Sequence, residues 1–115
     1  MSEQPSLFEI SKAAPDVERI TLYALGEFQS RGKVLADREL ALDRLRGAFK
    51  RATEKFGTEE LSDEQIIESL KTLDAKIVQV PSFVAKHPFR VTISQSLAIR
   101  AFEFFKAEIE MEKEK

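Results

Sequence analysis

Residues 76–93 read KIVQVPSFVAKHPFRVTI, and this stretch decides the predicted fold class. In residues 77–80 and 89–93, β-branched or aromatic side chains partly alternate with polar ones, which is typical of half-buried β-strands. Pro81 and Pro88 bound the segment between them, and because proline has no backbone N–H, strand pairing should stop at each. The stretch therefore predicts a β-hairpin with a long loop in an otherwise helical chain.

Helical periodicity is present on both sides of this hairpin. Ser62 and Gln65 form a capping-box pattern that predicts the start of a short helix before it. Ser94 is expected to cap a final helix after it. The apolar residues of the final helix recur every three to four positions, which predicts one buried stripe. They are Leu97, Ala98, Ala101, Phe102, Phe105 and Ile109.

A further helix is predicted over residues 15–30. Pro15 suits a first helical turn, where its missing N–H costs nothing, and the helix dipole favours the negative charge of Asp16 there. Gly32 follows a basic last turn and predicts a left-handed cap. The helix should therefore end close to this glycine.

The next helix ends at Gly57 and begins at Leu35 or Arg38. Its apolar positions alternate by three and four residues. They are Leu42, Leu45, Phe49, Ala52 and Phe56. Gly26 and Gly47 lie inside the first two helices, where a glycine costs about 1 kcal/mol relative to alanine. We therefore expect these two helices to cross closely at the glycines.

Together these patterns predict an α+β fold that is predominantly helical, with the order α-α-α-β-β-α and a single β-hairpin packed against helices. The 115 residues correspond to one typical domain. We expect a mobile N-terminal arm over 1–13, a single globular domain over 14–110 and a frayed C-terminal tail over 111–115.

Composition restricts the environment and the partners of the chain. Twenty acidic and 18 basic residues give a net charge of -2, which provides no overall attraction to nucleic acid or anionic membrane. Cysteine is absent, whereas small secreted domains usually contain disulfides. Residues 1–10 lack the basic and apolar regions of a signal peptide, and no membrane-spanning run of about 18 apolar residues occurs. We expect a soluble cytoplasmic protein that makes no membrane contact.

The chain offers few residues for catalysis. His87 is the only histidine, so within one chain the usual zinc sets and a Cys–His nucleophile pair are excluded. No glycine-rich nucleophile elbow or phosphate loop occurs. The acidic residues near Ser62 lie at a predicted helix start, where the dipole favours them, and do not have calcium-loop spacing. We therefore predict no catalytic residue, no metal site and no cofactor.

Basic residues are concentrated in one part of the chain, which suggests an alternative function. Residues 31–57 hold eight basic and four acidic residues, whereas residues 58–74 hold one basic and six acidic residues. Bases at helical spacing in the second helix would contact phosphates if they shared one face. The competing interpretation is a solvated helix surface of mixed sign. The nucleic-acid-binding residues of the alternative are Arg31, Lys33, Arg44, Arg51 and Lys55.

The predicted element order resembles that of winged-helix DNA-binding domains, in which the helix before the hairpin enters the major groove. In this chain that helix carries Asp63, Glu64 and Glu68 against one base, Lys71. Its charge disfavours contact with DNA. The resemblance is one of element order alone.

The final helix is the predicted partner-binding element. Phe102, Phe104 and Phe105 do not fit on one narrow stripe, because neighbours on a helix differ by about 100°. Either other elements cover both sides, or Ile99 and Phe104 form an exposed apolar patch of the kind that marks a partner site. We predict a small non-enzymatic cytoplasmic protein-interaction module, a homodimer or a subunit of a larger assembly, that binds through this helix and the hairpin edge. Nucleic-acid binding is the alternative.

Overall fold

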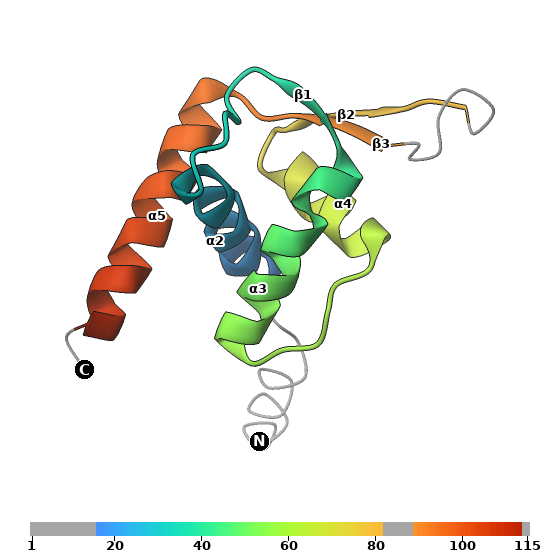
Figure 1. The fold of residues 1–115 in the computed structure, drawn as a ribbon. Helices are drawn as coiled ribbons and strands as arrows, with labels where there is room; N and C mark the ends of the chain where they lie inside the picture. Colours follow the sequence, from blue (N-terminus) through green and yellow to red (C-terminus); the bar gives the residue numbers. More distant parts are fainter. Residues whose placement is uncertain (1–15, 82–88, 114–115) are drawn as a thin grey trace, which may run out of the picture.

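The computed structural model describes residues 16–81 and 89–113 (Figure 1). The predicted arm over 1–13, the loop containing His87 and the last two residues of the chain lie outside this part. The predicted α+β class, predominantly helical, is confirmed. In chain order the elements are α2 (Val17–Ser30), β1 (Glu39–Ala41), the 3₁₀ turn η1 (Leu42–Leu45), α3 (Arg46–Phe56), α4 (Asp63–Thr72), β2 (Lys76–Gln79), β3 (Phe89–Thr92) and α5 (Gln95–Lys113).

Helix α2 occupies the centre of the fold. Its N-terminus is capped by Asp16, whose side chain accepts a hydrogen bond from the backbone N–H of Arg19 at 3.2 Å. Every residue from 20 to 28 is buried, because α3, α4 and α5 all pack against this helix (Figure 1). A helix covered on all sides forms the middle of the core.

The sheet has three antiparallel strands in the order β1-β3-β2. Val91 on the central strand β3 is fully buried and lies opposite Leu40 on β1 and Ile77 on β2. Strands β2 and β3 are the two strands of the predicted hairpin, and their register pairs Lys76 with Thr92. Since β1 pairs with the other side of β3, β2 is the strand of the hairpin that has a free edge among the described strands.

The second helix was predicted to start at Leu35 or Arg38. The structure instead has strand β1 in this region, and the helix starts later. Asp37 has a φ of 57°, a left-handed conformation that does not continue a right-handed helix. Its N–H donates to the Ile93 carbonyl at 2.7 Å, and Leu40 is buried against β3. The sheet therefore has one strand more than the predicted hairpin, and α3 begins only after η1.

The helix caps predicted before and after the hairpin are confirmed. The Gln65 N–H donates to the Ser62 hydroxyl at 3.2 Å, and the Ser62 N–H donates to the Gln65 side-chain oxygen at 2.8 Å. The Leu97 N–H donates to the Ser94 hydroxyl at 3.2 Å. Helix α5 then continues to Lys113, which lies inside the segment predicted to fray.

Gly26 marks a close approach of α2 to α5. A Cβ at this position would lie 2.3 Å from the Phe105 Cβ and 2.5 Å from the Ala101 carbonyl oxygen. A Cβ at Gly47 would instead meet the guanidinium of Arg51, at 3.3 Å, within the same helix. The prediction that these glycines mark a crossing of the first two helices is therefore wrong. The crossing that requires glycine is that of α2 with the final helix.

Candidate interaction surface

Helix α5 lies along one side of the fold, and among the described helices and strands its backbone packs against α2 alone (Figure 1). The buried residues of α5 are Leu97, Ala98 and Ala101. The side-chain amide of Gln29 on α2 donates to the Ala98 carbonyl at 2.8 Å. The rings of Tyr23 and Phe105 meet edge to face, with centroids 5.0 Å apart. These contacts define the inner face of α5.

The rest of the α5 surface, from the flank of the inner face to its opposite side, is called here the outer face. It consists of Ile99, Phe102, Glu103, Lys106 and Ile109. Ile99 is 51% exposed. Phe102 and Ile109 are half-buried and lie outside the core cluster of described residues. The ammonium of Lys106 lies 5.0 Å from the centre of the Phe102 ring. The outer face therefore combines apolar side chains with one acid and one base.

Ile99 and Phe104, the two residues predicted to bind a partner, do not form one patch. Ile99 is on the outer face, whereas Phe104 packs against the core. The guanidinium of Arg19 on α2 lies 5.9 Å from the centre of the Phe104 ring. Five residues on a helix correspond to an angular separation of about 140°, which explains the difference.

Phe102 and Ile109 were expected in the buried stripe of the final helix, and the structure places them on the outer face instead. They lie seven residues apart, and Ile99 precedes Phe102 by three, so all three fall toward one side of the helix. This spacing was visible in the sequence. The sequence did not show which side of the helix faces α2. Phe105 fits a buried stripe that includes Phe102 and Ile109 as well as one that includes Phe104.

Two of the five basic residues of the nucleic-acid alternative bind a single buried carboxylate. Glu27 is 8% exposed. Its side chain accepts hydrogen bonds from Arg51 Nε at 2.7 Å, from Arg51 Nη2 at 2.9 Å and from Arg31 Nε at 2.8 Å. Burial raises the pKa of Glu27, but the hydrogen bonds from the two guanidinium groups outweigh burial and hold this pKa below 4.5. Arg51 therefore joins α3 to Glu27 of α2, whereas Arg31 binds the same carboxylate from the end of α2 itself.

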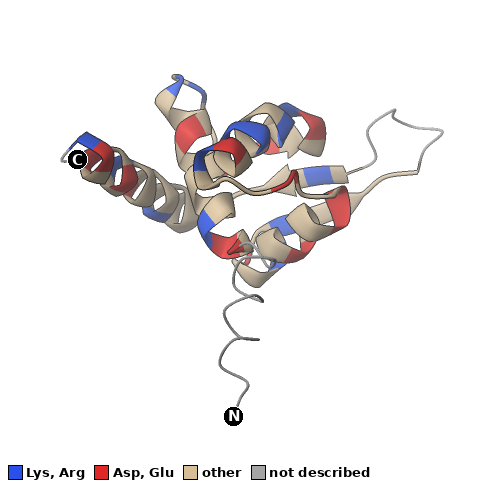
Figure 2. Cartoon of the chain, turned by 90° about the horizontal axis from the view of Figure 1, so that it is seen from below, with Lys and Arg blue, Asp and Glu red and all other residues tan. Residues whose placement is uncertain are grey.

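The other three basic residues differ in their surroundings. Lys55 pairs with Glu112 of α5 and lies 5.8 Å from the centre of the Tyr23 ring. Lys33 and Arg44 are exposed. Figure 2 shows Lys and Arg mixed with Asp and Glu along the same helices. The surface thus has mixed sign, as the competing interpretation of the basic segment expects.

The exposed side of α4 is acidic. Glu64 and Glu68 are exposed, and Asp63 in the first turn accepts a hydrogen bond from Arg46 Nη2 at 2.6 Å. Lys71 is the only base on this helix. This is the helix that precedes the hairpin, so its charge opposes insertion into a DNA groove.

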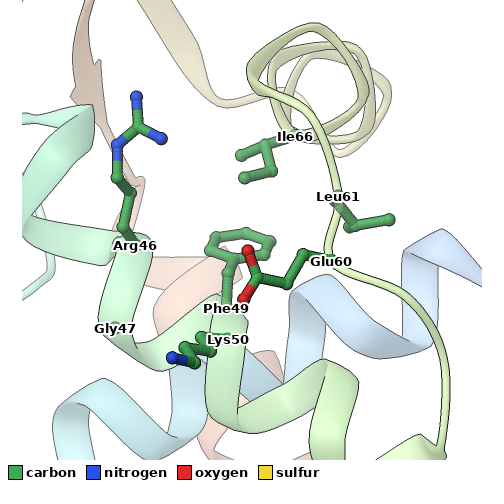
Figure 3. Close-up of a pocket in the computed structure, with 7 residues that line it drawn as sticks. All are labelled: Arg46, Gly47, Phe49, Lys50, Glu60, Leu61 and Ile66. Carbon is green, nitrogen blue, oxygen red and sulfur yellow. The ribbon is translucent and has the colours of Figure 1, made fainter.

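An open pocket of about 260 Å³ lies between α3 and the start of α4 (Figure 3). Its lining residues are Arg46, Gly47, Phe49, Lys50, Glu60, Leu61 and Ile66. Phe49 and Ile66 supply buried apolar surface, and Arg46 and Lys50 lie on the α3 side, across from Glu60 (Figure 3). Charged side chains of both signs thus surround a buried apolar surface, and the pocket offers a space for a small group.

Metal-binding groups and membrane-spanning helices are both missing from the described part of the chain. Within residues 16–81 and 89–113, no group of three or more His, Cys, Asp or Glu side chains is placed to hold a metal ion. No helix in that same part of the chain has the length and hydropathy to cross a membrane. In comparisons with family models, curated proteins and solved structures, no match to this chain was found.

Proposed function

We propose that this chain is a small, non-enzymatic, cytoplasmic protein-interaction module that works as a subunit of an assembly and binds through the outer face of α5. The observation that supports this most directly is the one-sided packing of α5, which leaves Ile99 at 51% exposure. Half-buried Phe102 lies about one turn further along the helix, and half-buried Ile109 about three turns further. Exposed apolar side chains on one side of a helix are typical of sites that bind another protein.

Nucleic-acid binding is the second candidate. It draws support from the third strand, since β1 makes the element order helix–strand–helix–helix–strand–strand more similar to that of winged-helix domains. The charges oppose it. Arg31 and Arg51 bind Glu27, and Glu64 and Glu68 lie on the helix that would face DNA. We therefore rank it below protein interaction.

The test is sedimentation velocity over a concentration series, at low and at high salt, with and without a short mixed-sequence duplex. The proposal expects association that persists in high salt, because apolar burial is not screened by ions. It also expects no duplex binding. A chain that stays monomeric and binds duplex only at low salt would contradict the proposal.

A pair of matched variants locates the surface. Ile99→Glu places a charge on the outer face and should abolish the association. Val34→Glu makes the same change at another exposed apolar side chain, 62% exposed in the connection between α2 and β1, and should leave association unchanged. Equal effects of the two variants would exclude the outer face of α5 as the binding surface.

A further inference from the structure

We propose that the partner of the outer face is a second copy of this chain, and that the two α5 helices pair antiparallel across a two-fold axis near residue 104. This inference rests on the proposed function, because it uses the same surface. In a two-fold symmetric interface, a surface meets its own copy. The residues of the outer face must therefore be complementary to one another.

The outer face is self-complementary when the helices run antiparallel. With the axis between residues 104 and 105, Glu103 on one copy lies opposite Lys106 of the second copy, and the two like-charged pairs lie on the diagonals. Ile99 then lies within one residue, about 1.5 Å of helix rise, of the position opposite Ile109 of the second copy. The two-fold axis repeats both contacts. Apolar pairs therefore flank a central set of opposite charges.

A parallel pairing lacks this complementarity. It would place Glu103 next to Glu103 of the second copy and Lys106 next to Lys106, and like charges in direct contact are repulsive. Within the described part of the chain, Glu103 has no basic partner and Lys106 has no acidic one. Both charges are thus available for the pairing that the antiparallel arrangement provides.

The position of α5 in the fold leaves room for this contact. The helix lies at the margin of the described structure beside α2, while α4 and the sheet lie on the far side of α2 (Figure 1). The ion pair between Lys55 and Glu112 and the ring contact of Tyr23 with Phe105 both involve the inner part of α5. A second helix on the outer face would therefore leave both of these contacts in place.

The absence of cysteine allows a direct test with two single-cysteine variants, Ile99→Cys and Ile109→Cys. One variant is labelled with ¹⁵N, the two are mixed in equal amounts under mild oxidation, and the disulfide-linked dimers are separated by mass. Because a disulfide forms only between Cα atoms closer than about 7 Å, the mixed dimer should exceed either homodimer about tenfold or more. Predominant linkage within the Ile99→Cys variant would overturn the antiparallel arrangement while leaving the proposed function intact.

Charge reversal gives an independent result. Glu103→Lys and Lys106→Glu should each weaken self-association about tenfold or more, since each change acts twice across the axis. The double variant should restore association, because it re-creates the same pairs with the signs exchanged. Association that is lost in Ile99→Glu but unaffected by charge reversal would overturn the arrangement alone. Association that none of these variants changes would overturn both the arrangement and the proposed binding surface.

Discussion

At the scale of single residues, the buried carboxylate of Glu27 links α2 to α3. It is buried, and it accepts three hydrogen bonds from two arginines. Glu27→Gln keeps the size of the side chain but removes its charge, which leaves two guanidinium groups without their counter-ion. We expect the free energy of unfolding to fall by about 1–3 kcal/mol, measured by urea denaturation at pH 7. The partial exposure of both arginines keeps the loss below that of a fully buried pair.

The control for this variant lies on the same helix. Glu18 pairs with Arg100 at 2.9 Å, with both side chains more than half exposed. Glu18→Gln should therefore change the free energy of unfolding by less than about 1 kcal/mol. Equal losses in the two variants would show that the burial of Glu27 does not add to its stabilising effect.

The stabilising effect of Glu27 should also depend on pH. Its pKa in the folded chain lies below 4.5, the ordinary value expected for the unfolded chain. The folded state therefore binds the proton less tightly, so the stabilisation is complete above the unfolded pKa and is lost as pH falls through the folded pKa. Urea denaturation between pH 7 and roughly pH 2 should show the difference between wild type and Glu27→Gln shrinking on acidification. A difference that stays constant over this range would contradict the assignment.

At the scale of elements, the contact between α2 and α5 depends on the absence of a side chain at Gly26. Alanine has the higher helix propensity, by about 1 kcal/mol. Its Cβ would nevertheless lie 2.3 Å from the Phe105 Cβ, and this overlap forces the two helices apart. We expect Gly26→Ala to destabilise the fold by about 1–3 kcal/mol or more, measured as a lower midpoint of urea denaturation.

Gly47→Ala is the matched control for this prediction, since that position also lies inside a helix. Its nearest neighbour is the end of the flexible Arg51 side chain at 3.3 Å, so the effect on stability should stay within about 1 kcal/mol. If Gly26→Ala were as stable as Gly47→Ala, the described approach of α2 to α5 would be wrong.

Some elements could be predicted from the residues close to them in sequence, and others could not. The cap residues Ser62 and Ser94 were found from the sequence, because a side-chain oxygen that accepts a backbone N–H is a local interaction. Strand β1 was missed. Its three residues continue an apolar pattern that suits a helix, and the hydrogen bonds that make it a strand come from β3, about 50 residues away in sequence.

At the scale of the whole molecule, association through α5 would link stability to concentration. A dimer that dissociates on unfolding gains stability as total protein rises. For a chain of this size we expect the melting temperature to rise by about 2–5 °C for each tenfold increase in concentration. Differential scanning fluorimetry over a dilution series should show this for wild type and for Val34→Glu. Ile99→Glu should melt at one temperature throughout, and a wild-type melting temperature independent of concentration would contradict the association.

The sequence by itself determined the helical content, the hairpin strands and two helix caps. It also showed that the final helix has more apolar residues than one narrow buried stripe can hold. These follow from local periodicity and from hydrogen bonds between residues close in the chain. Only the tertiary structure decided that Arg31 and Arg51 share Glu27, that Gly26 faces α5, and that Phe104 packs against the core whereas Phe102 does not. Each of these depends on which side of one helix meets another, and that choice is made by packing between distant segments, which no local pattern specifies.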